Sequence, residues 1–147
     1  MSGAAAAWLL DIGAGRLAAV GAREQLHLVH QPKVYAVPSA PRHCRHVLLL
    51  GEQCIPVLDV LARVCGHAAP QGGLLGIYGY PGDDAQTVAL GALWLSAPPR
   101  SIRVEDAAAS DLPDPATAWA GVAHACFARD GQAVPILDLA RLFRAAV

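Results

Sequence analysis

The chain alternates between short apolar runs and clusters of glycine, proline and acidic residues. Most apolar runs have the length of a strand, and few continue far enough for a helix. Helices are expected only at residues 59–64 and 138–146. Many short strands with so few helices predict a mainly β, barrel-like architecture. The expected strands cover residues 8–12, 16–20, 26–29, 45–50, 54–58, 74–80, 87–95, 101–104, 119–128 and 132–137.

One segment of the chain occurs twice in similar form. Residues 54–64 read CIPVLDVLARV and residues 133–143 read AVPILDLARLF, so that Pro56 and Pro135 lie 79 positions apart. Each copy predicts a short strand with a proline, then an aspartate at a helix N-cap, then a short apolar helix. Because proline has no N–H to donate, we expect each strand at a sheet edge or with that position turned outward. The capping residues would be Asp59 and Asp138.

Two longer loops interrupt the strand pattern. Residues 66–73 are rich in glycine, alanine and proline, which predicts a crossing between two lobes. Residues 105–118 contain two prolines and several acidic residues, which predicts an excursion loop. We expect residues 1–147 to form a single domain of two similar lobes, with the chain ends exchanging between the lobes.

Composition narrows the functional classes. Hydrophobic residues make up 54% of the chain and the mean hydropathy is +0.37, so some apolar side chains should line a groove or a partner surface. A homodimer is one arrangement that would cover such a surface. A net charge of −1 with scattered arginines argues against a nucleic acid partner. No apolar run approaches the ~20 residues of a membrane-spanning helix, so we expect no direct membrane insertion. The four cysteines lack paired spacing, which indicates free thiols and a cytoplasmic location.

Three weak motifs could carry chemistry. Residues 13–18 fit the dinucleotide fingerprint G-x-G-x-x-A, but Gly21 would interrupt the helix it needs, so a hairpin turn is favoured. The paired carboxylates Asp83 and Asp84 follow a Pro-Gly pair, which indicates a solvated turn. No zinc-site spacing joins the neighbouring side chains His27, His30, His43, Cys44 and His46. We therefore expect no catalytic residue, no metal, no cofactor and no enzymatic activity.

The order and spacing of three segments resemble the CheW family of chemotaxis adaptors. Residues 34–41 are similar to the family's segment before its first long hairpin, with a Pro-x-x-Pro-like close at Pro38 and Pro41. Residues 45–61 are similar to the signature G-V-x-N-x-R-G-x-x-x-P-V-x-D-L, which keeps Pro56, Val57 and Asp59. Residues 134–143 are similar to the closing segment x-P-x-L-D-x-x-x-L.

This resemblance implies two small five-stranded SH3-like β-barrels with a hydrophobic groove between them. It also implies a non-enzymatic adaptor that couples a chemoreceptor to a CheA-type histidine kinase. One barrel would meet the regulatory domain of the kinase, and the cytoplasmic tip helix of a methyl-accepting receptor would lie against the groove. A type IV pilus system or another dedicated chemosensory pathway would suit such a protein.

The chain also departs from the family pattern. Aligned on Pro56, the family's arginine–glycine pair falls on Gly51-Glu52 and an earlier glycine falls on His46, which indicates a divergent CheW-like protein. Alternating apolar positions usually face a core, so Val47 and Leu49 are candidates for the core as well as for binding. The alternative function is a small β-barrel scaffold or ligand-binding module unrelated to chemotaxis. The residues expected to bind partners are Val34, Tyr35, Val37, Pro38, Val47, Leu49, Gly51 and Glu52.

Overall fold

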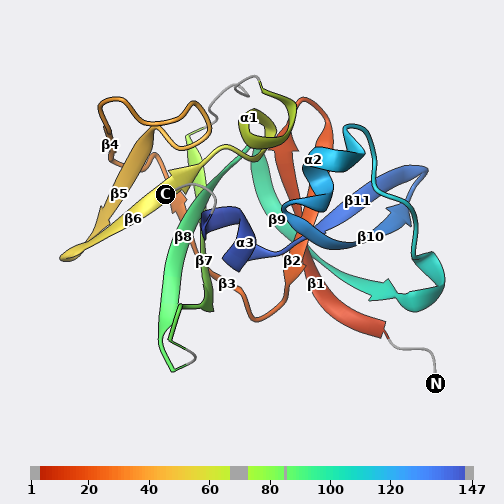
Figure 1. Ribbon diagram of the computed structural model, residues 1–147. Helices are drawn as coiled ribbons and strands as arrows, with labels where there is room; N and C mark the ends of the chain where they lie inside the picture. The colour runs from red at the N-terminus through yellow and green to blue at the C-terminus, as the bar shows by residue number, and fades with distance from the viewer. Residues whose placement is uncertain (1–3, 67–72, 85, 145–147) are drawn as a thin grey trace.

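A computed structural model describes residues 4–66, 73–84 and 86–144 of the chain (Figure 1). The fold is mainly β, with a few short helices. The strands are β1 (Ala4–Gly13), β2 (Arg16–Gly21), β3 (Gln25–His30), β4 (Val34–Ala36), β5 (His46–Leu50), β6 (Gln53–Leu58), β7 (Leu74–Pro81), β8 (Val88–Leu95), β9 (Ala97–Glu105), β10 (Ala123–Arg129) and β11 (Gln132–Leu137). The helices are α1 (Val60–Cys65), α2 (Ala116–Ala120) and α3 (Leu139–Arg144), and a short 3-10 turn is η1 (Asp106–Ala108).

The strands form two sheets. Sheet A has the order β10-β11-β2-β1-β9, and sheet B has the order β3-β7-β8-β6-β5-β4. Most neighbours are antiparallel, but each sheet contains one parallel pair, β11 with β2 and β6 with β8. Sheet B has one strand more than the five expected, because the three residues of β4 pair with β5 and form an edge.

The internal repeat corresponds to a structural repeat. Read from one edge, β9-β1-β2-β11-β10 has the same parallel and antiparallel neighbours as β3-β7-β8-β6-β5. The same hydrogen bond also recurs 79 positions along the chain. Asp59 N donates to His43 O and Asp138 N donates to Val122 O, both at 2.8 Å. The two sheets are therefore two copies of one arrangement.

The two prolines of the repeat lie in interior strands, so the first of the two expected placements, a sheet edge, is wrong. On the antiparallel side, Pro56 is paired with Val47, and Pro135 is paired with Cys126. The parallel pairing on the other side begins one residue after each proline. Because proline cannot donate to a ladder, it restricts this parallel pairing to the end of the strand.

The apolar side chains gather in three clusters. One contains only side chains of sheet A, such as Leu9 and Phe127, and another contains only side chains of sheet B, such as Ile55. The largest cluster draws on both sheets and on all three helices. Each sheet therefore curls around a small core of its own, and the two sheets share a third core.

The chain passes from sheet A to sheet B between β2 and β3 and returns between β8 and β9 (Figure 1). The crossing predicted at residues 66–73 lies largely outside the described residues, and the strands on either side of it, β6 and β7, belong to the same sheet. Helix α1 follows β6 of sheet B along the chain but contacts β1 of sheet A. Helix α3 follows β11 of sheet A but contacts β7 of sheet B. Each helix thus packs onto the opposite sheet. The division into lobes with exchanged ends stays a prediction.

Two segments differ from the sequence expectation. Trp119 does not begin a strand but lies in α2, fully buried in the shared core, and β10 starts only at Ala123. Burying the large indole decides the local conformation here, because tertiary packing outweighs weak local propensity. Strand β9 is longer than predicted and includes Pro98 and Pro99, which an edge strand tolerates.

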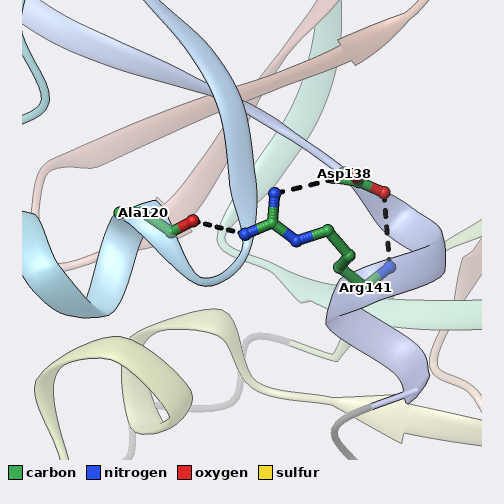
Figure 2. A network of polar contacts seen from close by, with 3 residues as sticks. All are labelled: Ala120, Asp138 and Arg141. Atoms are coloured by element: carbon green, nitrogen blue, oxygen red, sulfur yellow. Dashed lines mark hydrogen bonds and ion pairs between the residues drawn. The ribbon is translucent and has the colours of Figure 1, made fainter.

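The repeated aspartates lie at the starts of α1 and α3. The Asp59 carboxylate accepts the Ala62 N–H at 3.2 Å, and the Asp138 carboxylate accepts the Arg141 N–H at 3.3 Å. The Arg141 guanidinium also forms an ion pair with Asp138, with 3.9 Å between Nη1 and Oδ2. It donates to the carbonyl of Ala120 as well, and Figure 2 shows both contacts. Arg141 therefore connects α3 to the end of α2.

Replacing either aspartate by alanine should destabilise the protein, because it removes an acceptor from the first turn of a helix. The expected loss is about 1 kcal/mol at each site. Asp59→Ala should be the more damaging change, since Asp59 is buried whereas Asp138 is partly exposed. Urea unfolding of the two variants measures both losses. Equal stability of Asp59→Ala and the unaltered protein would contradict the capping role.

Candidate functional site

An exposed apolar face covers one side of β4, β5 and β6. The register aligns Tyr35 with Val47 and Val47 with Pro56, and it aligns Leu49 with Cys54. Cross-strand partners and alternate residues of a strand lie on the same face of a sheet. These five side chains therefore form a continuous apolar surface, which we call the β4–β6 face. Its two most exposed large side chains are Tyr35, at 49%, and Leu49, at 52%.

The opposite side of the same strands is core. Val34, Leu48 and Ile55 are aligned across the three strands and pack in the cluster of sheet B. Of the residues expected to bind partners, Val34 is thus placed on the inner side. Val37 and Pro38 follow β4 and are exposed, and the Val37 N–H donates to Arg45 O at 2.7 Å.

The turn between β5 and β6 carries the last two predicted binding residues. Gly51 has a φ of 62°, which a side chain would disfavour, and Glu52 is exposed beside it. The turn therefore keeps a glycine, one position before the place where the family has one. Glu52 has no ion-pair partner among the described residues.

A second apolar feature lies between the two sheets. A groove of about 330 Å³ is lined on one side by Trp8, Pro98 and Pro99 of sheet A and on the other by residues 25–28 of sheet B. An adjoining hollow of about 410 Å³ extends it along Leu26, which is 45% exposed, toward Val88. The adjoining hollow is lined by strands of sheet B and by turn residues, and we call the two hollows together the inter-sheet groove. Its indole wall is fixed in place, because Trp8 Nε1 donates to Ala22 O at 3.2 Å.

Sequence reasoning missed several residues of these two surfaces. Cys54 and Pro56 lie on the β4–β6 face beside the predicted residues, and the groove residues were not identified at all. The signal for Cys54 was available, since it lies two positions before Pro56 on the same strand. The groove had no local signal, because its walls come from segments more than 60 positions apart, at Leu28 and Pro98.

The weak chemical motifs have structural roles. Gly13 to Gly15 form the turn between β1 and β2, and a strand follows instead of a phosphate-binding helix. The Asp84 carboxylate accepts the Gln86 N–H at 3.0 Å within a turn. No group of three or more potential metal-ligating His, Cys, Asp or Glu side chains gathers among the described residues. Burial raises the pKa of the Cys44 thiol, which makes it less reactive.

Comparison with solved structures identifies the architecture. The scaffolding protein CheW from Thermoanaerobacter tengcongensis superimposes with a TM-score of 0.74, covering 95% of this chain and 87% of that protein. The chain has a CheW-like fold. The two sequences are 17% identical, so the likeness concerns the fold. No protein-family model matches the sequence, and no curated protein matches it.

The CheW-like fold places the two apolar surfaces in context. The β4–β6 face lies on sheet B alone, and the inter-sheet groove lies where the two copies of the arrangement meet. Within the described ranges, no helix has the length and apolar character to cross a membrane.

Proposed function

We propose that this protein is a non-enzymatic chemosensory adaptor that couples a chemoreceptor to a CheA-type histidine kinase. The observation that carries the proposal is the CheW-like fold at a TM-score of 0.74 together with two exposed apolar surfaces on it. Exposed apolar patches on a small domain commonly mark interaction sites. The cytoplasm, where receptor tips and kinases meet, is the expected location.

The two surfaces suit two different partners. The β4–β6 face is an exposed apolar surface of three paired strands, and it fits the barrel surface of a kinase regulatory domain. The inter-sheet groove is concave and apolar, and it fits the apolar side of a receptor tip helix. We therefore assign the kinase to the β4–β6 face and the methyl-accepting receptor to the groove.

Direct binding measurements test this function. The chain is titrated, by calorimetry or interferometry, with the regulatory domain of a CheA-type kinase and with the coiled-coil tip of a receptor from the same organism. Saturable binding of both, and a ternary complex in gel filtration, is the expected result. Binding of neither partner by the folded protein would favour the alternative, a β-barrel scaffold or ligand-binding module unrelated to chemotaxis. Elution of the free protein at twice its mass would show that it forms a homodimer. Binding to a kinase from a type IV pilus system would identify the pathway.

Reversing the charge at Glu52 should alter kinase binding. Glu52 is exposed at the tip of the hairpin that carries the β4–β6 face, so Glu52→Arg changes the charge of the rim without removing a packed side chain. Rim charges act mainly on association rates and on salt dependence. We expect a changed association rate with an unchanged unfolding midpoint. The same rate and salt dependence as in the unaltered chain would place the turn outside the interface.

A further inference from the structure

A small polar hollow lies at the start of β5, separate from both apolar surfaces. It has a volume of about 60 Å³ and is closed on one side by Val57 and Trp94. A single water needs ~10–15 Å³ on the same kind of measure, so the hollow holds a group of a few heavy atoms. Its polar lining consists of Arg42, His43, Arg45, His46 and Asp59.

Positive charge predominates around this hollow. The arginines Arg42 and Arg45 carry permanent charge, and Arg63 lies close enough to act on His43. The Asp59 carboxylate is the acidic member of the lining, and it is engaged by the first turn of α1 through the Ala62 N–H. With neutral imidazoles the lining residues carry a net charge of +1, and protonation of His43 would raise it to +2.

The two imidazoles at the hollow have different surroundings. The ring of His46 meets that of Trp94 edge-on, with centroids 6.2 Å apart and an interplanar angle of 90°. His43 Nε2 is buried and has no hydrogen-bond partner among the described residues. A buried polar atom without a partner costs free energy.

We propose that this hollow is a binding site for a single tetrahedral oxyanion of the phosphate class. The arginines and histidines that line the hollow are hydrogen-bond donors, which suits a compact group with several equivalent oxygens. Arg42 Nη1 donates to Gly66 O at 2.9 Å, so this guanidinium has only its other N–H groups to offer. The size of the hollow suits one such group. The oxyanion could be free phosphate or the phosphoryl group of a phosphorylated side chain. This inference does not depend on the adaptor function.

The site should bind anions more tightly as the pH falls. Burial lowers the pKa of His43, and the neighbouring Arg63 lowers it further, so the imidazole is neutral at pH 7. A bound anion opposes both effects and favours the protonated ring, and binding should therefore take up a proton. The groups that face His43 here are Arg42, Arg45, His46, Asp59 and Arg63.

Calorimetric titration with sulfate, phosphate and a phosphoserine peptide tests the site. Sulfate is the first probe, because it stays a dianion throughout and isolates the titration of the protein. Between about pH 8 and about pH 5.5, on either side of the ordinary His pKa of ~6.5, sulfate affinity should rise about tenfold or more. Phosphopeptide binding tighter than phosphate binding would indicate a protein-borne group, and the reverse would indicate free phosphate.

Matched variants locate the binding. Arg45→Gln should weaken sulfate binding about tenfold, since one charge-assisted hydrogen bond is lost. Arg103→Gln makes the same charge change on the exposed edge strand β9 of sheet A and should leave binding unchanged. The variant His43→Gln should remove the pH dependence that the proposal assigns to this imidazole. Absence of saturable binding, or equal loss in the Arg45 and Arg103 variants, would overturn the proposal.

Discussion

Replacing Phe143 by alanine should lower the free energy of unfolding by about 3–5 kcal/mol, the range for a large aromatic side chain removed from a core. Phe143 is 1% exposed and belongs to the core shared by the two sheets. Its ring stacks on Tyr80, with centroids 5.3 Å apart and planes within 6°. Helix α3 follows β11 of sheet A and packs against β7 of sheet B (Figure 1). Phe143 on this helix therefore joins the two sheets.

The Phe143 ring packs against Gly91 on β8, where there is no side chain. A Cβ atom at position 91 would lie 2.3 Å from Cζ of Phe143, closer than any real contact. Gly91→Ala alone should therefore destabilise the protein by about 1–3 kcal/mol through overpacking. In the Phe143→Ala background the same methyl group enters the vacated space, so the two losses should not add.

Urea unfolding of the two single variants and the double variant measures this coupling. Leu26→Ala is a suitable control, because Leu26 is 45% exposed and lies outside the shared core. Additive losses at positions 91 and 143 would contradict the packing of the Phe143 ring against Gly91. A loss of less than about 1 kcal/mol for Phe143→Ala would contradict the role of α3 in joining the two sheets.

The strands and the repeat could be predicted from the sequence because their signals are local. A proline, an aspartate and an apolar run in fixed order occur in both copies, and each copy forms a strand followed by a helix. The turn at Gly13 to Gly15 was likewise readable, because glycines there adopt positive φ values. The likeness to CheW adaptors rested on the order of three weak segments, and the fold confirms it at the level of architecture.

Other features have no local signal. The run Val47-Leu48-Leu49-Leu50 is apolar at every position, so the sequence cannot show which residues face the core. The register with β4 and β6 decides it, and Leu48 is buried while Leu49 is exposed. The helical position of Trp119 depends on a core built from distant strands. The polar hollow at the start of β5 is lined by residues as far apart in the chain as Arg42 and Trp94. No sequence pattern connects these two positions.

Exchanging one exposed leucine for glutamate on each apolar surface should separate the two proposed partners. Leu49 lies on the β4–β6 face at 52% exposure, and Leu26 lies on the inter-sheet groove at 45% exposure. A charge at the centre of an apolar interface must be desolvated without a partner when the complex forms. Leu49→Glu should therefore weaken kinase binding by more than about tenfold, and Leu26→Glu should do the same to receptor binding.

Each variant is the control for the other, because residue type, charge change and exposure are matched. Both side chains are solvent-exposed strand positions, so each substitution should alter the free energy of unfolding by no more than about 0.5 kcal/mol. Titration of both variants with the kinase regulatory domain and with the receptor tip gives four affinities. Reciprocal loss would establish two separate docking surfaces on one small fold. Loss of both partners in one variant would mean that they share a surface, and four unchanged affinities would remove both surfaces from the adaptor's contacts.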